Sequence, residues 1–350
     1  MALQVDIKKK FPGFYLETAF EINGGCMGIL GASGCGKSMT LKCIAGIETP
    51  DEGRIVLNGR TFYDSQKKIN LRTQERGVGY LFQNYALFPT MTLEENIAIA
   101  IPGKNKEKQG TVQAVIRQFR LEGLEKRYPS ELSGGQQQRG ALARMLVHKP
   151  ELIMLDEPFS ALDGFLKDVL QLEMLELLQQ YEGNVLMVSH NRDEIFKFCD
   201  SMTLLSDGRG ILTGSVREIF EMPKKMEAAR LTGCKNISAI TKIGEYQLLA
   251  LDWNMILNTR EKIGDHTAFV GVRAHRLMPA WENTGENTMK IVQDGYTETP
   301  FERQYLFRNA KDENSSRIWW IADKEKFTAN GEGEFPPYMK FPKEHLMLLE

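Results

Sequence analysis

The stretch Gly31-Ala32-Ser33-Gly34-Cys35-Gly36-Lys37-Ser38 fits the phosphate-binding pattern G-x-x-x-x-G-K-S/T. The apolar run 26–30 before it predicts a buried strand, and the run 39–45 after it predicts a helix. Glycines allow a tight turn whose backbone N–H groups point into one concavity, and the helix start adds unpaired donors. We expect Lys37 to reach the β- and γ-phosphates of a nucleoside triphosphate and the Ser38 hydroxyl to bind Mg2+.

Composition is that of an ordinary globular chain. The 350 residues are 42% hydrophobic and 26% charged, and 44 Lys and Arg against 46 Asp and Glu give a net charge of -2. Nucleic-acid-binding proteins are usually basic, so this balance speaks against that class. No run approaches the roughly 18 apolar residues of a membrane-spanning helix. The five cysteines form no zinc or disulfide pattern, which favours a reduced cytoplasm.

The pattern of elements predicts two domains. Over residues 1–222, apolar strands alternate with helices, which favours an α/β core. The fully apolar runs 152–155 and 185–188 are typical of strands buried on both faces of a parallel sheet. Helical character dominates from about 84 to 150, a helical subdomain. Residues 223–350 predict a small all-β, barrel-like domain. Its expected strands are 246–252, 266–273, 289–292, 304–308 and 318–322.

Two further motifs could act on a bound phosphate. Leu132-Ser133-Gly134-Gly135-Gln136 precedes a helix, so its glycines expose N–H groups at a helix start and offer a second phosphate site, although Ser133 and Gln136 also suit a plain helix cap. Asp156 and Glu157 follow a buried strand. Asp156 can hold Mg2+, and Glu157 can orient or deprotonate water, unless both are simply solvated acids.

Two single residues complete the pattern. His190 follows the strand at 185–188 and could hydrogen-bond a γ-phosphate, although a lone histidine is more often structural. Gln83 stands at the end of the apolar run 78–82, where its amide could meet a metal or a water, or be plain polar surface.

In order and spacing, these motifs together with Ser160-Ala161-Leu162-Asp163 resemble the ATP-binding subunits of ABC transporters over about residues 1–220. The resemblance implies a P-loop NTPase fold with a RecA-like core and a head-to-tail dimer that closes on two MgATP. It implies catalytic roles for Glu157, His190 and Gln83, and Mg2+ ligation by Ser38, Gln83 and Asp156. The ATP contacts that it implies are Phe11, Gly31, Ala32, Ser33, Gly34, Cys35, Gly36, Lys37, Ser38, Met39, Ser133, Gly134, Gly135, Gln136 and Asp163.

Some positions stay open or depart from the family. The adenine-stacking aromatic is expected to be Phe11, with Phe14 and Tyr15 as rivals. Gly140 stands inside the signature helix, where a better helix former is usual, and Ser189 replaces the commoner threonine. Neither departure removes a chemical group that hydrolysis needs.

The segment Asn84-Tyr85-Ala86-Leu87-Phe88-Pro89 resembles importers within that family. The resemblance implies membrane permease subunits and, indirectly, a periplasmic or extracellular solute-binding protein. The subunit would then lie on the cytoplasmic face of the membrane as a peripheral protein. Tandem cassettes or a coiled-coil insertion would favour an ABC ATPase that works without a transporter, and the sequence shows neither. A small-molecule P-loop kinase is a third candidate class, but the motif at 132–136 would have no function in such an enzyme.

The segments 222–239 and 271–275 resemble the ATPases of molybdate importers, whose second domain is an oxyanion-binding-like barrel. Molybdate or tungstate is therefore the expected solute, with sulfate or another small solute as the alternative. A regulatory oxyanion could contact Lys235 and Asn236, although this stretch reads equally well as a linker turn.

Overall fold

A computed structural model describes residues 2–101, 105–160, 164–283, 285–324 and 335–350. The chain forms two compact units, Met1–Val216 and Arg217–Glu350. The division between them lies a few residues before the position at 222 and 223 that composition suggests. Among the described residues, no helix combines the length and apolar character needed to cross a membrane.

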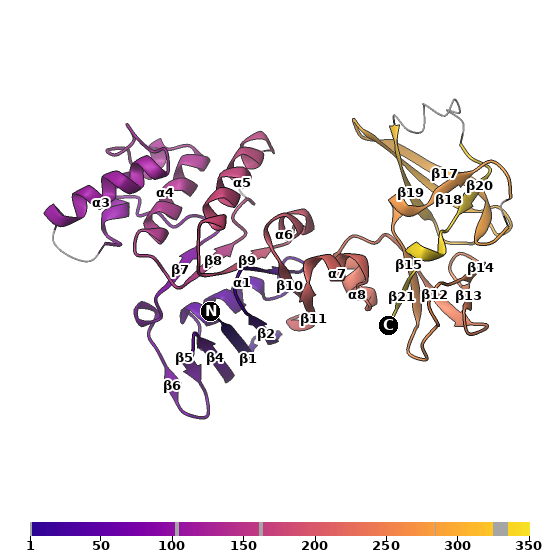
Figure 1. Cartoon of the computed structure of the whole chain (residues 1–350), viewed down its shortest axis with the longest axis horizontal. Helices are drawn as coiled ribbons and strands as arrows, with labels where there is room; N and C mark the ends of the chain where they lie inside the picture. Colours follow the sequence, from indigo (N-terminus) through magenta and orange to yellow (C-terminus); the bar gives the residue numbers. More distant parts are fainter. Residues whose placement is uncertain (1, 102–104, 161–163, 284, 325–334) are drawn as a thin grey trace. The chain divides into compact units, whose positions relative to one another are not determined.

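The first unit alternates strands and helices, coloured from indigo to salmon in Figure 1. Its strands are β1 (Leu3–Phe11), β2 (Phe14–Ile22), β3 (Cys26–Leu30), β4 (Glu52–Leu57), β5 (Arg60–Asp64), β6 (Ile69–Asn70), β7 (Val78–Leu81), β8 (Leu152–Asp156), β9 (Asn184–Ser189), β10 (Ser201–Ser206) and β11 (Arg209–Ser215). Its helices are α1 (Lys37–Ala45), α2 (Leu93–Ala98), α3 (Asn105–Gln118), α4 (Gly134–Leu146), α5 (Gly164–Gln179) and α6 (Arg192–Phe198).

In the described part of this unit, one sheet takes the order β6-β5-β4-β1-β2-β11-β10-β3-β9-β8-β7. The neighbours β10, β3, β9, β8 and β7 pair in parallel, whereas β1, β2, β4, β5 and β6 pair antiparallel. Parallel strands place their carboxyl ends at one edge, where open α/β sheets bind ligands. The loops after β3, β7, β8 and β9 therefore meet at one edge, and each of them carries a predicted functional residue.

The parallel strands form the centre of the core. Every residue of β3, β8 and β9 is buried, because the sheet is covered on both faces. The main hydrophobic cluster joins these strands to α1 and to the antiparallel strands, so the loop between β3 and α1 stands on a rigid base.

Arg76 closes the C-terminal end of α1 and is only 1% exposed. Its Nη1 donates to the carbonyl oxygens of Cys43 (2.8 Å) and Ile44 (2.7 Å). Its Nε donates to Leu71 O (3.0 Å), and its Nη2 donates to Asn70 Oδ1 (2.9 Å). The C-terminus of a helix carries unpaired carbonyls and partial negative charge, which this cation neutralises. Burial lowers the pKa of Arg76 to about 10, so the side chain stays charged at neutral pH.

Helices α2, α3 and α4 form the helical part of this unit, and α2 packs against both α3 and α4. Gly140 lies in α4, where a Cβ atom would stand 2.7 Å from Cδ1 of the fully buried Leu93 in α2. A glycine costs a helix about 1 kcal/mol relative to alanine. The close approach of α2 and α4 is the physical reason for this departure from the family pattern.

The second unit is mostly β-structure, as predicted. Its strands are β12 (Asn236–Lys242), β13 (Gln247–Ala250), β14 (Met255–Asn258), β15 (Phe269–Val272), β16 (Met278–Ala280), β17 (Thr288–Glu298), β18 (Glu302–Asn309), β19 (Ile318–Asp323), β20 (Tyr338–Lys340) and β21 (Met347–Leu349). The helix α7 (Val216–Glu221) spans the division between the units, and α8 (Met226–Leu231) begins the second.

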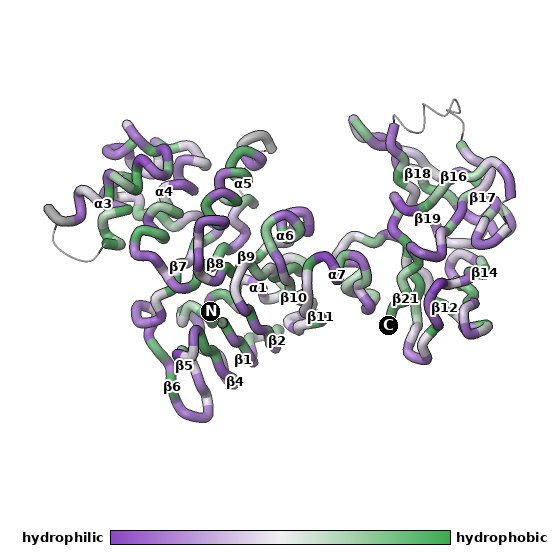
Figure 2. The backbone as a smooth tube through the Cα atoms, viewed as in Figure 1, coloured by the Kyte–Doolittle hydropathy of each residue, from purple (hydrophilic) through white to green (hydrophobic). Residues whose placement is uncertain are grey.

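These strands form two antiparallel sheets, in the orders β14-β13-β12-β15-β21 and β16-β20-β17-β18-β19. One core cluster contains residues of both sheets, including Leu248 and Val270 of the first and Phe307 and Trp320 of the second. Figure 2 shows hydrophobic residues along β21, which packs its buried side chains into this unit.

The five strands expected in this domain are present, but β12, β14, β16, β20 and β21 were missed. Four of these are only three or four residues long, too short for an alternating pattern to stand out. The fifth, β12, begins at Asn236, within the stretch for which the sequence leaves a ligand site and a linker turn open.

Candidate nucleotide-binding site

The loop between β3 and α1 has the backbone that its glycines predict. Gly34 and Gly36 adopt positive φ angles of 81° and 104°, which are unfavourable for other residues. A Cβ atom at Gly31 would stand 2.2 Å from Leu205 O, so only glycine fits there. The outer residues of the loop (Ala32, Ser33 and Gly34) are exposed.

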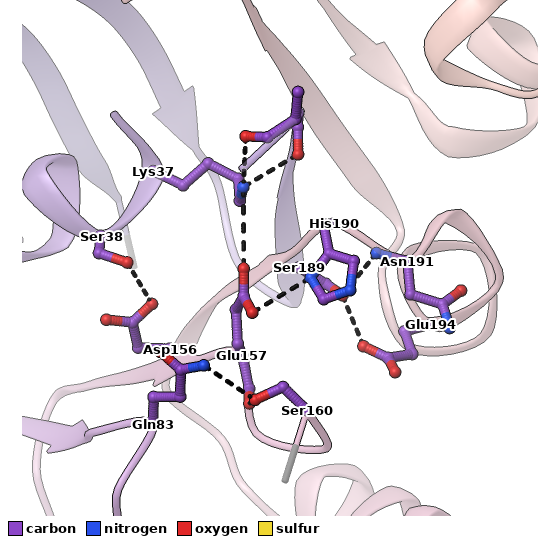
Figure 3. A network of polar contacts seen from close by, with 12 residues as sticks. Lys37, Ser38, Gln83, Asp156, Glu157, Ser160, Ser189, His190, Asn191 and Glu194 are labelled. Carbon is purple, nitrogen blue, oxygen red and sulfur yellow. Dashed lines mark hydrogen bonds and ion pairs between the residues drawn. The ribbon is translucent and has the colours of Figure 1, made fainter. Parts of the chain in front are cut away.

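Lys37 begins α1 and points back under the loop (Figure 3). Its Nζ donates to the carbonyl oxygens of Gly31 and Ala32, both at 2.9 Å. The same nitrogen lies 3.8 Å from Glu157 Oε1, and the two side chains are only 4% and 16% exposed. The lysine is therefore held in place by groups that an incoming phosphate can replace.

Asp156 ends β8 and has both carboxylate oxygens occupied. Ser38 Oγ donates to Oδ1 at 2.7 Å, and Tyr80 Oη donates to Oδ2 at 2.9 Å. Burial, followed by the charge of Asp156, raises the pKa of the Tyr80 phenol far above its usual range, so the phenol remains a donor. A hydroxyl and a carboxylate in contact are the hard oxygen ligands that Mg2+ prefers.

Glu157 follows directly and adopts a left-handed conformation with φ of 48°, which is uncommon for a residue with a side chain. Its backbone N–H donates to Val188 O in β9 at 3.0 Å. Its Oε2 lies 3.1 Å from Nδ1 of His190, so one carboxylate contacts both Lys37 and His190. The structure thus gathers the predicted residues of three loops into one network (Figure 3).

The loop that carries His190 is anchored by Ser189 together with Asn191, Glu194 and Lys167, three residues that the sequence analysis did not single out. Ser189 Oγ donates to Glu194 Oε2 at 2.5 Å and accepts the N–H of Asn191 at 2.9 Å. Glu194 is buried and also pairs with Lys167 Nζ at 2.6 Å. Both hydrogen bonds that anchor this loop through Ser189 are made by its hydroxyl group.

Gln83 is exposed and is bound elsewhere in this structure. Its Nε2 donates to Ser160 Oγ at 3.3 Å, and that hydroxyl donates to Glu157 O at 3.0 Å. Within the described residues, no hydrogen bond or ion pair joins Gln83 to Asp156 or to Ser38, so its predicted metal role stays a prediction.

Ser133 caps α4, as its sequence setting allows. Its Oγ accepts the N–H of Gln136 at 3.4 Å, while Gln136 Oε1 accepts the N–H of Ser133 at 2.9 Å. Ser133 and Gly134 are exposed, whereas Gly135 is buried. In the described part of the chain, no hydrogen bond or ion pair joins residues 133–136 to the phosphate loop.

The aromatic candidates lie at the turn between β1 and β2. The Phe14 ring is beside the phosphate loop, because a Cβ atom at Gly36 would stand 2.8 Å from Phe14 Cζ. Phe11 lies next to it, with ring centroids 6.0 Å apart, and carries Lys9 Nζ over its face at 5.0 Å. Phe11 and Phe14 are half-buried, and Tyr15 is exposed.

The remaining predicted contacts divide into three cases. Met39, near the start of α1, is half-buried and packs against the main core. Cys35 is 6% exposed, and burial raises the pKa of its thiol. Asp163 lies outside the described residues and stays a prediction.

Asn236 is not available as a surface ligand for an oxyanion. It is 2% exposed, its Nδ2 donates to Trp319 O at 2.8 Å, and its Oδ1 accepts the N–H of Trp319 at 2.7 Å. The side chain therefore joins β12 to β19. Lys235 is exposed, with its Nζ 4.0 Å from the centroid of the Trp319 ring.

Known proteins are similar to this chain in sequence and in fold. The family model described as "ABC transporter" matches residues 18–160. A solved structure, the dimeric post-hydrolysis state of the ATP-binding cassette MJ0796 bound to ADP and Pi, is similar with a TM-score of 0.52. It is 24% identical and covers 62% of this chain and 99% of that chain. At this identity the likeness shows the fold alone, and it confirms the predicted cassette fold.

Curated import ATP-binding proteins are similar to this chain over part of its length. The Fe(3+) ions import ATP-binding protein FbpC of Haemophilus influenzae (strain 86-028NP) is 39% identical over 221 residues, 62% of this chain and 62% of that protein. The spermidine/putrescine import ATP-binding protein PotA of Vibrio parahaemolyticus is 39% identical over 243 residues, which is 68% of this chain and 63% of that protein. This chain thus spans less than two thirds of the length of both relatives.

A third relative is covered almost completely. The probable sulfate/thiosulfate import ATP-binding protein CysA of Chlorella vulgaris is 36% identical over 236 residues, which is 66% of this chain and 98% of that protein. With the matching family model and the cassette fold, this similarity decides the family. The chain belongs to the ABC transporter family, among its import ATP-binding proteins.

Proposed function

We propose that the chain is the ATP-hydrolysing subunit of an ABC importer. The observation that supports this most strongly is the network at the carboxyl ends of β3, β8 and β9. There Glu157 lies between Lys37 (3.8 Å) and His190 (3.1 Å), while Ser38 and Asp156 form an oxygen pair beside it. A cation, an acid, a histidine and a metal-type oxygen pair at the ligand edge of a parallel sheet suit phosphoryl transfer to water.

In this proposal the phosphate loop binds the triphosphate. The exposed N–H groups of the loop and the start of α1 attract the β- and γ-phosphates. Lys37 gives up its contacts with Gly31 O, Ala32 O and Glu157 and turns its donors to the phosphate oxygens. The half-buried Phe14 and Phe11 offer faces for the adenine, and Phe14 is the one in contact with the loop.

The oxygen donors fit Mg2+, which usually binds to one or two protein oxygens together with substrate phosphates and water. Ser38 Oγ and Asp156 would hold the ion, and Gln83 would join them on release from Ser160. Bound Mg2+ neutralises charge on the phosphates of the nucleotide. Among the described residues, no group of three or more His, Cys, Asp or Glu is arranged so that it could hold a metal ion by itself.

Hydrolysis then proceeds by attack of water on the γ-phosphorus. Glu157 orients this water and accepts its proton, and the bond from the γ-phosphorus to the bridging oxygen breaks to release ADP and phosphate. His190, 51% exposed on its side-chain surface and beside Glu157, is placed to hydrogen-bond the γ-phosphate. The contact between Glu157 and His190 keeps both groups near the position of the reacting atoms.

We further propose that the site is completed by a second copy of the chain. Ser133 and Gly134 are exposed at the start of α4, and no described contact links them to their own phosphate loop. An exposed helix start with free N–H groups suits a γ-phosphate held by a partner. Asp163 would contact the nucleotide across the same interface.

The transport partners follow from the relatives, which are named as import ATP-binding proteins. We propose permease subunits in the membrane, a solute-binding protein outside it, and a position of this chain on the cytoplasmic face. The resemblance at 222–239 and 271–275 favours molybdate or tungstate as the solute. The sulfate/thiosulfate relative, covered over 98% of its length, favours sulfate as the second candidate.

The second unit is proposed to regulate transport by binding an oxyanion. Because Asn236 is buried and paired, Lys235 is the one of the two expected ligands still exposed. A thermal-shift titration of the full chain with molybdate, tungstate and sulfate tests this. A rise in the unfolding temperature that Lys235→Ala removes supports the site, and no shift with any of the three anions rules it out.

The decisive experiment for the function is ATP-dependent uptake by the chain reconstituted with its permease in vesicles. Uptake of molybdate is measured with tungstate and sulfate as competitors. It should require MgATP on the side of the vesicle membrane that carries this chain, and it should stop in the Glu157→Gln variant. Competition by sulfate alone would move the solute assignment to sulfate. ATP hydrolysis without uptake of any tested solute would contradict the import role.

A further inference from the structure

We propose that Tyr80 is a positioning residue for the metal-binding carboxylate of Asp156. The proposal rests on the ATPase function above and concerns one hydrogen bond, from Tyr80 Oη to Asp156 Oδ2 at 2.9 Å. Through this bond the phenol fixes the rotation of the carboxylate, so that Oδ1 stays directed to Ser38, which donates to it at 2.7 Å.

The two donors approach different oxygens of one carboxylate. Ser38 comes from α1 and Tyr80 from β7, so Asp156 is held between two elements. A carboxylate with one free oxygen can rotate about its last bond, whereas one held at both oxygens keeps a single orientation. Because Tyr80 takes Oδ2, it does not compete with a cation for Oδ1 and the Ser38 hydroxyl.

Strand register explains why Tyr80 reaches this position. β7 pairs in parallel with β8, and Tyr80 stands opposite Met154. Residues two apart on a strand share a face, so Asp156 lies one step further along the same face as Met154. The long phenol ring spans that step.

The Tyr80 ring is itself well supported. It stacks on Phe82, with centroids 4.2 Å apart and planes inclined by 26°, and it packs against the main core. A rigid donor loses little freedom when it holds a partner, which is what a second layer of residues around a metal requires.

The plain alternative is that the Tyr80 hydroxyl only satisfies a buried group and stabilises the fold. Tyr63 offers a matched control, because it also packs with the main core and donates through its Oη to a neutral acceptor, Pro50 O, at 2.7 Å. Tyr80→Phe and Tyr63→Phe each remove one hydroxyl and one hydrogen bond. Only the first removes a bond to the proposed metal ligand.

The experiment measures nucleotide binding, without hydrolysis, by fluorescence of a labelled ATP analogue over a series of Mg2+ concentrations. In Tyr80→Phe we expect the Mg2+ concentration for half-maximal enhancement of binding to rise about tenfold, since residues behind a metal ligand typically change metal affinity by about 10–100-fold. Binding in excess EDTA should be unchanged, and Tyr63→Phe should behave as wild type in both conditions.

Direct Mn2+ binding in the presence of nucleotide, followed by electron paramagnetic resonance, gives a second readout. In an Asp156→Asn background, Tyr80→Phe should cause no further loss, because the two residues act through one bond. An unchanged Mg2+ dependence in Tyr80→Phe, or an equal shift in Tyr63→Phe, would overturn the proposal. Normal Mg2+-dependent binding with no hydrolysis in wild type would instead refute the ATPase function and leave the Tyr80 comparison intact.

Discussion

Replacing Glu157 by Gln is expected to slow hydrolysis and at the same time to tighten ATP binding. The substitution keeps the size of the side chain and removes one negative charge. That charge lies 3.8 Å from Lys37 Nζ and 3.1 Å from His190 Nδ1, with the glutamate only 16% exposed. ATP must draw Lys37 away from this charge and must also bring its own negative phosphates close to it.

The magnitude follows from the distance. At 3.8 Å, two unit charges attract by about 4 kcal/mol with an effective dielectric constant of about 20. Glu157 also contacts His190, and Lys37 also contacts two backbone carbonyls, so we assign about a third of this attraction, or ~1.4 kcal/mol, to the competition with ATP. Its loss in Glu157→Gln should raise the ATP affinity about tenfold. Loss of a general base typically lowers the rate by about 10²–10⁴-fold.

Two measurements on one preparation test this. Calorimetric titration with ATP in EDTA gives the affinity, and phosphate release with MgATP gives the rate. Glu151→Gln is the control, because Glu151 is an exposed acid at the opposite end of β8 whose Oε2 accepts from Asn58. Weaker ATP binding in Glu157→Gln would refute the proposed competition for Lys37, and a wild-type rate would remove Glu157 from catalysis.

Three further predictions concern single residues. Lys37→Ala should weaken ATP binding by about 10–100-fold, since charge-assisted hydrogen bonds contribute about 1.5–3 kcal/mol, and calorimetry would show it; equal affinity would contradict the phosphate role. Arg76→Lys should lower the free energy of unfolding by about 2 kcal/mol in urea, because a lysine keeps the charge but loses the fork that binds α1 carbonyls. The Cys35 thiol, with its pKa raised by burial, should react slowly with iodoacetamide at pH 8 and faster as pH rises; rapid labelling at pH 8 would contradict its burial.

The sequence predicted the elements around the site well because each carries a strong local signal. A glycine loop between an apolar strand and a helix has few alternative structures, and the structure places it between β3 and α1. Asp156, Glu157 and His190 were singled out because they directly follow runs predicted to be buried strands. The structure places Glu157 in contact with both Lys37 and His190.

Other features depended on contacts between segments far apart in the chain, which no local pattern records. Tyr80 appeared as one aromatic in an apolar strand, and only the register of β7 with β8 brings its hydroxyl to Asp156. Asn236 looked like a surface donor because its partner, Trp319, lies more than 80 residues away. Glu194 could have been suspected from its position four residues after His190, as an acid on the inner face of a short helix.

The proposal that two copies share each ATP site has a direct test in mixed variants. Lys37→Ala damages the phosphate loop, and Ser133→Arg blocks the exposed start of α4. Each variant alone should hydrolyse almost no ATP. In a mixture, a dimer with one copy of each has one site built from two intact halves, so the rate should recover to as much as about a quarter of wild type. No recovery on mixing, with both variants folded and exchanging subunits, would mean that each chain carries its own complete site.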